Sequence, residues 1–196
     1  MPGLRERKKR ATRAAIHHAA LRLFAAQGFG RTTIDQIADA ADVSRATVFS
    51  YFASKEDIVF GDAPTAVEAL AGALRERPVI PAVREWLGSL EGWIERELVL
   101  QLRLAREVPS VGARRLQIYG DIERVVADAL EAELGERLPA ELAAASLMAG
   151  LRIVEETAAA RMEKDGREML APEREALFAD AVRFAEAGIA AVTASA

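Results

Sequence analysis

The chain has 196 residues, a net charge of −4 and no cysteine, and 51% of its residues are hydrophobic. The lack of cysteine excludes a disulfide framework, a zinc finger and thiol chemistry. No uninterrupted apolar stretch approaches the roughly 18 residues that cross a bilayer, and the basic N-terminus leads into an amphipathic pattern rather than an apolar signal core. Because alanine is abundant and β-branched or aromatic runs are scarce, we expect an all-α cytoplasmic protein of one domain or two small ones, with no membrane partner.

The basic residues are concentrated at the N-terminal end. Residues 1–55 carry ten lysine and arginine side chains against four acidic ones, a net charge of +6, so that residues 56–196 carry −10. A basic N-terminal segment joined to an acidic remainder indicates that only residues 1–55 bind a polyanion. We therefore expect residues 1–9 to form a disordered basic arm that contacts phosphates or a minor groove.

A first helix is expected over residues 10–27, with Gly28 as its C-terminal stop. The two histidines of the chain, His17 and His18, are adjacent within it and therefore point about 100° apart. They do not converge as metal ligands. We expect a surface pair and no metal site.

The helices that follow carry a full set of N-terminal caps. Thr33, with Gln36 three residues later, has the pattern of a capping box. Asp42 lies in the turn, and Ser44 is a good N-cap for the second helix. Ser54 is expected to cap a third helix directly after it.

The second of these helices presents a polar outer face. Val48 and Phe52 lie four residues apart and point inward. The outward side chains are basic, hydroxylic and aromatic: Arg45, Thr47, Ser50 and Tyr51. Two short helices joined by a tight turn, with such a face on the second, are typical of a helix-turn-helix that places its recognition helix in the major groove of DNA.

The stretch LRLFAAQGFGRTTIDQIADAADVSRATVFSYFASKEDIV resembles the DNA-binding segment of the TetR family of transcriptional regulators. The shared patterns are Phe-x-x-x-Gly, Thr-Thr-x-x-x-Ile-Ala, Val-Ser-x-x-Thr-x-x-x-Tyr-Phe and Ser-Lys-Glu, and the resemblance covers residues 5–60. Asp42 stands where the family usually has glycine, but aspartate tolerates left-handed backbone. The segment EVPSVGARRLQIYGDIERVVADALEAELG further resembles regulators of the actinobacterial type.

The resemblance implies an all-α fold in two parts. Residues 1–54 would form a three-helix DNA-binding domain, and residues 55–196 a helical bundle for ligand binding and dimerisation. The partner would be a palindromic operator in double-stranded DNA, bound by a homodimer. The implied base contacts come from Arg45 and Thr47, and the implied phosphate contacts from Thr33, Ser44, Tyr51 and Lys55, with Ser50 in either role. The ammonium of Lys55 and the N–H groups beside it are also suited to hold a phosphate.

Pro64 interrupts the helix that follows Lys55. A proline inside a helix removes a hydrogen bond and clashes with the carbonyl four residues back, here Phe60. The helix is therefore either kinked or broken near residues 61–64, or it simply starts again at Pro64. In the first case we expect the helix to resume as far as Arg77. The resemblance implies that this helix connects the DNA-binding domain to the ligand-binding domain, so a hinge here would be functionally placed.

Both tryptophans of the chain, Trp86 and Trp93, lie in one apolar stripe of a helix that begins at Ala82. This stripe is either ordinary core or the wall of a ligand cavity. In the next segment, Arg103 and Arg106 either meet an anionic group of the ligand or lie on a solvated helix face. A further helix is expected over residues 114–134, with Leu116 facing inward. The candidate ligand-binding residues are Trp86, Leu90, Trp93, Arg103, Arg106, Tyr119, Ile122, Met148 and Leu151.

Two long helices, over residues 140–164 and 172–192, end the chain. The first is rich in small side chains, which let helices approach closely, and Leu142 belongs to its apolar stripe. The resemblance implies that both pair with their symmetry mates in a four-helix dimer interface, with Ala145, Ala149, Phe178 and Phe184 as candidate contacts. Such a dimer places two recognition helices about one DNA turn apart, roughly 34–36 Å.

The chain shows no pattern typical of an enzyme. It contains no glycine-rich phosphate loop, no nucleophile elbow and no Glu-x-x-His pair. Glu155 and Glu156 diverge on a helix, and Arg152, four residues before Glu156, favours a surface salt bridge. We expect no catalytic site and no cofactor.

The expected function is that of a ligand-responsive repressor, released from its operator by a small, largely apolar effector. Some relatives of the actinobacterial type sense acyl-CoA thioesters or other lipophilic metabolites, and the resemblance implies that ligand class. The alternative is a helical-bundle carrier protein that binds a small molecule without operator binding. A duplex-binding assay separates the two.

Overall fold

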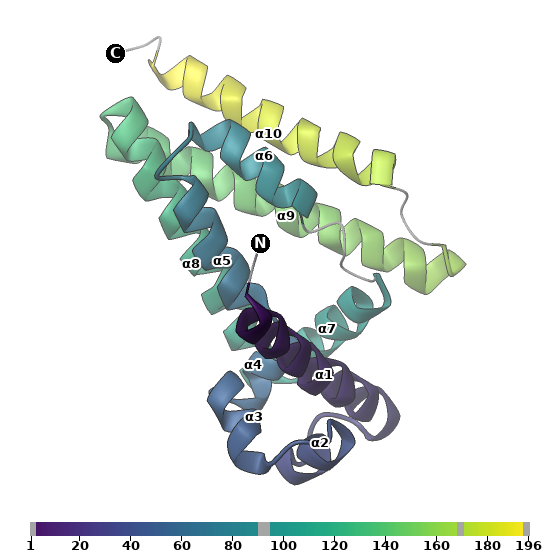
Figure 1. The fold of residues 1–196 in the computed structure, drawn as a ribbon. Coiled ribbons are helices and arrows are strands. Elements are labelled where there is room, and N and C mark those ends of the chain that lie inside the picture. The colour runs from purple at the N-terminus through teal and green to yellow at the C-terminus, as the bar shows by residue number, and fades with distance from the viewer. Residues whose placement is uncertain (1–2, 90–94, 168–170, 194–196) are drawn as a thin grey trace. The chain divides into compact units, whose positions relative to one another are not determined.

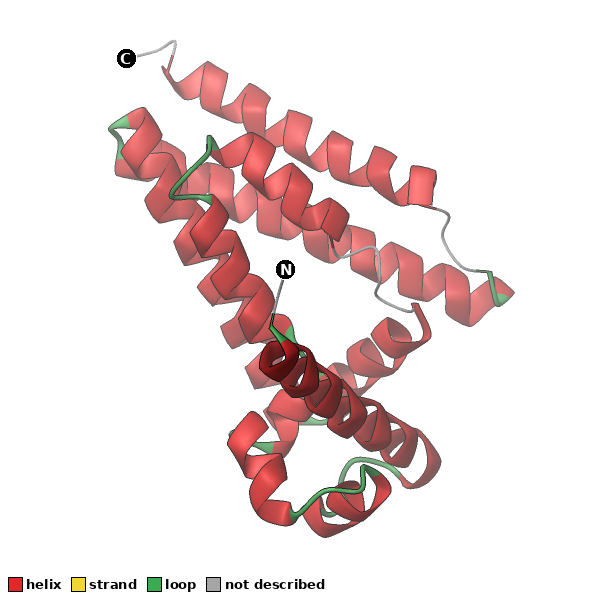
Figure 2. Ribbon diagram, viewed as in Figure 1, coloured by secondary structure: helices red, strands yellow, loops and turns green. Residues whose placement is uncertain are grey.

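The computed structural model describes residues 3–89, 95–167 and 171–193, and within these ranges it contains ten helices and no strand (Figures 1 and 2). The prediction of an all-α protein is confirmed. None of the helices in the described ranges is long and apolar enough to cross a membrane.

The chain forms two compact units. Unit 1 consists of Met1–Pro64 and Leu100–Leu116, and unit 2 of Thr65–Val99 and Gln117–Ala196. Unit 1 thus extends beyond residue 54 and includes a segment from the middle of the chain. The functional division at residue 54 stays a prediction.

Unit 1 is built on α1 (Leu4–Gln27), α2 (Ile34–Ala40), α3 (Arg45–Tyr51) and α4 (Lys55–Val59). It also contains the end of α7 (Glu95–Glu107) and the first turns of α8 (Pro109–Leu134). Apolar side chains from each of the first four helices meet in its core: Ile16, Ala20, Phe24, Ile37, Val48 and Ile58. This core fixes the helix-turn-helix from its inner side.

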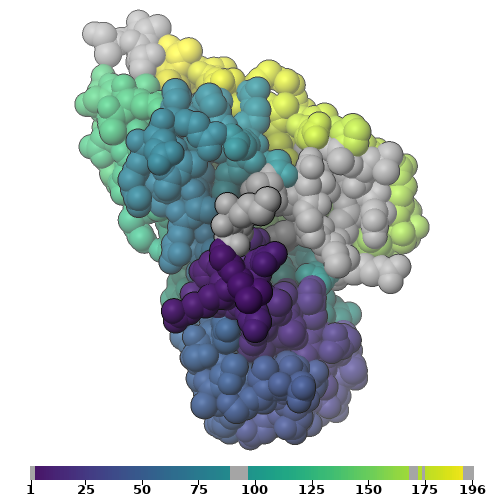
Figure 3. All heavy atoms as spheres, viewed as in Figure 1, coloured from purple at the N-terminus to yellow at the C-terminus, as the bar shows by residue number. Residues whose placement is uncertain are grey.

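The N-terminal arm that we expected to be disordered is helical from Leu4 onward, so the prediction is wrong for residues 4–9. The first turn is closed by the N–H of Arg7, which donates to the carbonyl of Gly3 at 3.1 Å. Leucine, glutamate, lysine and arginine all favour helix, and they extend a helix that the core already anchors. These purple turns lie at the surface in Figure 3.

The interruption at Pro64 is a fresh helix start. α4 ends at Val59, and Gly61 has a left-handed φ of 52°. α5 (Ala63–Ala73) then begins with Pro64 in its first turn, where a missing N–H is tolerated. The predicted break is therefore confirmed, and a new helix starts one residue before Pro64, although it ends four residues before Arg77.

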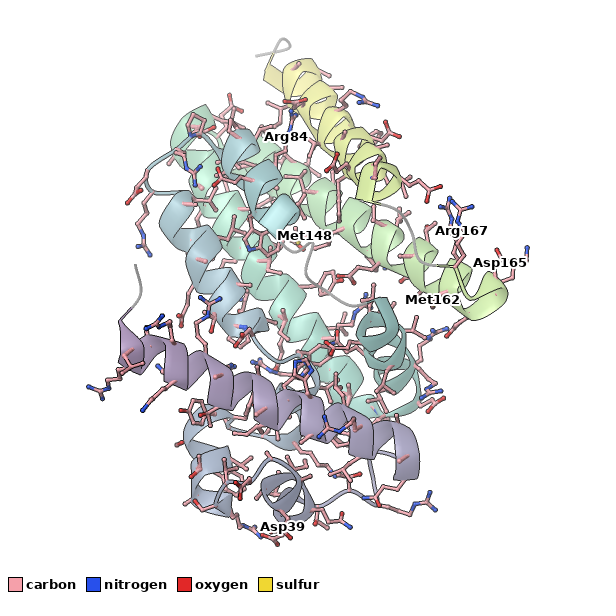
Figure 4. All side chains as sticks on the ribbon, turned by 45° about the vertical axis from the view of Figure 1, so that its right-hand side comes forward. Asp39, Arg84, Met148, Met162, Asp165 and Arg167 are labelled. Carbon is pink, nitrogen blue, oxygen red and sulfur yellow. The ribbon has the colours of Figure 1, made fainter. Side chains whose placement is uncertain are left out.

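Unit 2 contains α6 (Val79–Ser89), α9 (Arg137–Asp165), α10 (Ala171–Thr193) and most of α5 and α8. α9 and α10 lie side by side along their lengths, and α6 also packs against α10 (Figure 1). Gly150 marks the closest approach of α9 to α10, since a Cβ atom there would lie 2.3 Å from that of Ala181. Met148 points into the helices of this unit (Figure 4).

Two leucines that we expected to face inward are exposed. Leu116 is 74% exposed and Leu142 53% exposed. The buried positions of α8 include Val111, Ile118, Ile122, Val126 and Leu130, and Leu116 falls on another side of the helix. Hydrophobicity alone assigned both leucines to the buried face of their helix, but apolar residues also occur on exposed faces.

Candidate nucleic-acid interface

The helix-turn-helix is fixed locally by its caps, as predicted. Thr33 Oγ1 accepts from the N–H of Gln36 at 3.2 Å, and the Gln36 amide oxygen accepts from the N–H of Thr33 at 2.9 Å. Ser44 Oγ accepts from the N–H of Thr47 at 3.0 Å. Asp42 takes the left-handed turn position with a φ of 54°. The angle between α2 and α3 therefore follows from short-range hydrogen bonds.

α3 has one buried side and one open side. Val48 and Phe52 are buried, as predicted. Of the residues expected on the outer face, Arg45 and Ser50 are exposed, while Thr47 and Tyr51 are half-buried. Sequence reasoning missed Phe49, whose ring is 46% exposed on the open side of the helix.

The polar groups on this face pair with one another. Arg45 Nη1 donates to both carboxylate oxygens of Asp35 on α2, at 3.1 and 2.9 Å. The hydroxyls of Ser44 and Thr47 lie 2.8 Å apart, and Ser50 Oγ donates to the Thr47 carbonyl at 2.7 Å. Because exposed ion pairs are worth only about 0–1 kcal/mol, Arg45 can exchange Asp35 for another acceptor at little cost.

Lys55 occupies a different environment from the one that its phosphate role implies. Its ammonium donates to the carbonyls of Phe29 and Thr32, at 2.8 and 2.9 Å, and lies 4.2 Å from the ring centroid of Phe29. The charge of Lys55 therefore holds the connection between α1 and α2. A phosphate would have to share this ammonium with two carbonyl oxygens.

Arg13 fastens the end of α3 and the turn after α4 to α1. Its guanidinium donates to the carbonyls of Tyr51 and Gly61 at 2.7 and 2.8 Å, and lies 2.5 Å from the Asp62 carboxylate. The sequence held a signal for this role, because Arg13 lies three residues before Ile16 and so continues the inner stripe of α1.

Two further side chains hold α4. His17 Nδ1 donates to the Ile58 carbonyl at 2.6 Å, so the expectation of a surface histidine pair is wrong for His17, which is half-buried. From the first turns of α8, Arg114 lies 2.5 Å from the carboxylate of Asp57. Neither contact was predicted from the sequence.

Unit 1 carries further exposed basic side chains in α1 and just before α2. They are Arg5, Arg7, Lys8, Lys9 and Arg10 in the first turns of α1, together with Arg22 and Arg31. The acidic Asp39 lies on the outer side of α2 (Figure 4). The net positive charge of this segment is suited to a polyanion.

The candidate ligand-binding residues are divided between the units. Ile122, Met148 and Leu151 are buried in unit 2, and Trp86 Nε1 donates to the Ala66 carbonyl at 2.9 Å. Tyr119 is half-buried, and its hydroxyl donates to the Glu155 carboxylate. Two others, Arg103 and Arg106, are exposed and belong to unit 1, while Leu90 and Trp93 lie outside the described residues.

A hollow of about 310 Å³ lies between α6 and α10 in unit 2. Arg84 and Glu175 supply its charged side chains, and Leu87, Phe178 and Val182 its apolar lining. Phe178, a candidate dimer contact, thus faces this hollow. Among the residues that the structure describes, no group of three or more His, Asp or Glu side chains is placed to hold a metal ion.

Comparison with known proteins agrees with the geometry. Residues 16–60 match the family described as "Bacterial regulatory proteins, tetR family". The chain is 35% identical over 145 residues to the HTH-type transcriptional regulator TcmR of Streptomyces glaucescens, a match that covers 64% of this chain and 63% of TcmR. It is 31% identical over 144 residues to the uncharacterized HTH-type transcriptional regulator YdeS of Bacillus subtilis, covering 67% of this chain and 71% of YdeS.

A solved structure shares the fold. The TetR-family repressor FadR of Thermus thermophilus, in complex with lauroyl-CoA, matches with a TM-score of 0.53 and 24% identity over 90% of this chain and 94% of that one. The described residues thus combine a capped helix-turn-helix and an open second helix with an all-α fold, and the match spans slightly less than two thirds of the length of TcmR. The chain belongs to the TetR family.

Proposed function

We propose that the chain is a ligand-responsive repressor, which binds a palindromic operator as a homodimer and is released by a small, largely apolar effector. The observation that carries the proposal is the two-sided α3. Its apolar side is buried in the core of unit 1, while its open side presents Arg45, Phe49 and Ser50 to solvent. A short helix held in this way is suited to the major groove.

Each group on this surface has a proposed role. Arg45 and Thr47 read base edges, because bidentate arginine contacts to guanine are the commonest specific contact in the major groove. Ser44 and Thr33, at the starts of α3 and α2, hold phosphates together with Tyr51 and Lys55, the last through the ammonium that it shares with two carbonyls. The Ser50 hydroxyl contacts either a base edge or a phosphate.

The proposed dimer uses an exposed apolar stripe of α9 together with α10. Large hydrophobic side chains that stand in solvent commonly mark an interface. On α9 such side chains form one stripe with two alanines, at intervals of three and four residues, and on α10 Phe184 is 72% exposed. The stripe consists of Leu138, Leu142, Ala145, Ala149 and Ile153.

The effector is proposed to bind in unit 2 and to weaken DNA binding through its preference for one conformation over another. The support is the bundle itself, with Trp86, Met148 and Leu151 among its buried side chains. FadR of Thermus thermophilus was solved with lauroyl-CoA, which makes this thioester the first effector to test.

The test is a binding assay with genomic duplex fragments, followed by addition of lauroyl-CoA. Selective retention of a few fragments, reversed by the thioester, is the expected result. Selective retention that persists with the thioester would contradict this effector and leave DNA binding intact. Binding of the thioester without retention of any duplex would support the alternative, a carrier protein.

A further inference from the structure

Phe49 stands out on the open side of α3. Phe49 is 46% exposed, whereas Val48 directly before it and Phe52 three residues after it are buried. Its exposed neighbours one turn back are Arg45 and Ala46, and Ser50 follows it. The open side of the helix therefore combines a cation, a methyl group, an aromatic ring and a hydroxyl in one patch.

The ring and the cation of this patch are already in contact. The guanidinium carbon of Arg45 lies 5.6 Å from the ring centroid of Phe49, within the range of a cation–π interaction. Arg45 is held at the same time by Asp35. The ring thus borders the space into which Arg45 extends.

The chemistry of phenylalanine limits what it can contact. Its side chain has no donor or acceptor, so it makes no conventional hydrogen bond to a phosphate or a base edge. In the major groove the one apolar group that distinguishes a base is the C5-methyl of thymine, and phenylalanine is one of the side chains that contact it. A thymine methyl packed on the ring would bury apolar surface of Phe49 that is now exposed to solvent.

We propose that Phe49 reads a thymine methyl beside the base that Arg45 reads. This inference rests on the proposed function and adds a base preference to it. Residues four apart on a helix are about 6 Å apart along its axis, which corresponds to at most two base steps of about 3.4 Å. The thymine is therefore expected within two base pairs of the guanine contacted by Arg45.

The experiment begins with selection of duplexes from a random pool by the full chain. Each thymine of the enriched site is then replaced by deoxyuridine, which lacks only the C5-methyl. At one position per half-site the wild-type chain should lose about four-fold in affinity, the equivalent of one buried methyl. Phe49→Ala should bind the thymine and deoxyuridine duplexes equally at that position.

Two variants serve as controls. Asp39→Asn changes an exposed side chain of α2 to which no DNA contact is assigned and should keep the thymine preference, and Phe49→Leu, which retains an apolar side chain, should keep part of it. Because Phe49 is exposed, all three variants should melt at the wild-type temperature.

The outcomes separate this inference from the proposed function. An enriched site whose binding ignores every replacement, or a thymine preference that persists in Phe49→Ala, would overturn the inference and leave the regulator intact. A pool from which no sequence is enriched would contradict the proposed function, and the inference with it.

Discussion

Arg45 of α3 donates through one nitrogen to both carboxylate oxygens of Asp35 in α2, at 2.9 and 3.1 Å. The two side chains are 60% and 62% exposed, so the pair contributes little to folding stability. Its proposed consequence is for DNA binding, because Asp35 would compete with a guanine for the same guanidinium.

Replacing Arg45 tests this relationship. We expect Arg45→Ala to cost about 1–3 kcal/mol in binding to the operator and to relax the preference at one base pair per half-site. Lys8→Ala, in the exposed first turns of α1, is the matched control and should weaken binding equally for all sequences. The measurement is a titration of operator and mismatched duplexes. An unchanged preference in Arg45→Ala would assign base reading to another residue.

The ion pair between Asp57 and Arg114 should be worth more than an exposed one. Asp57 is 13% exposed and Arg114 26%, and Asp57 Oδ2 also accepts from Ser54 Oγ at 2.8 Å. A double-mutant cycle of Asp57→Asn and Arg114→Gln should give a coupling free energy of about 1–2 kcal/mol in urea unfolding.

The control for this cycle lies on the same helix as Arg114. Asp121 and Arg124 form a pair on α8 whose side chains are 48% and 65% exposed, and their coupling should stay below about 0.5 kcal/mol. Equal couplings for the two pairs would show that burial of the Asp57 pair adds nothing.

Gly150 should be the glycine of unit 2 that least tolerates a side chain. A Cβ there would meet Ala181 at 2.3 Å, so Gly150→Ala must push α9 and α10 apart, at a cost of about 1–3 kcal/mol. Gly120→Ala on α8 is the matched control, since nothing lies within 4 Å of its added Cβ. This control should gain about 0.5–1 kcal/mol from helix propensity. Thermal melts at equal protein concentration compare the two, and a Gly150→Ala chain as stable as Gly120→Ala would refute the close contact.

The proposed dimer interface is tested by a charge on α10. Phe184→Glu should convert the dimer into monomers, because two carboxylates would face an apolar seam. Leu116→Glu places the same charge at another exposed apolar residue, outside α9 and α10, and should stay dimeric. Sedimentation measures both, and a dimeric Phe184→Glu chain would place the interface elsewhere.

The parts of the site that are fixed by short-range contacts could be predicted from the sequence. Thr33 with Gln36, Ser44 with Thr47, and the left-handed Asp42 all act within four residues, so their spacing alone determines the geometry. The helix-turn-helix and its inner side followed directly from these caps and from helical periodicity.

Contacts between distant residues could not be predicted in this way. Lys55 binds a carbonyl 26 residues earlier, and Arg114 binds Asp57 across 57 residues. Periodicity shows that a residue faces inward but not which group it meets there. The exposure of Phe49 could not be predicted for a related reason, because its hydrophobicity favours burial while its place on α3 puts it on the open side.

Footprinting on the enriched operator tests the central proposal most directly. Two recognition helices in one dimer should protect two half-sites arranged as an inverted repeat, with centres about 10 base pairs apart or a whole number of turns further. The proposed dimeric repressor predicts both half-sites protected together and both released by the effector. Protection of a single isolated half-site, or of no defined sequence, would contradict it.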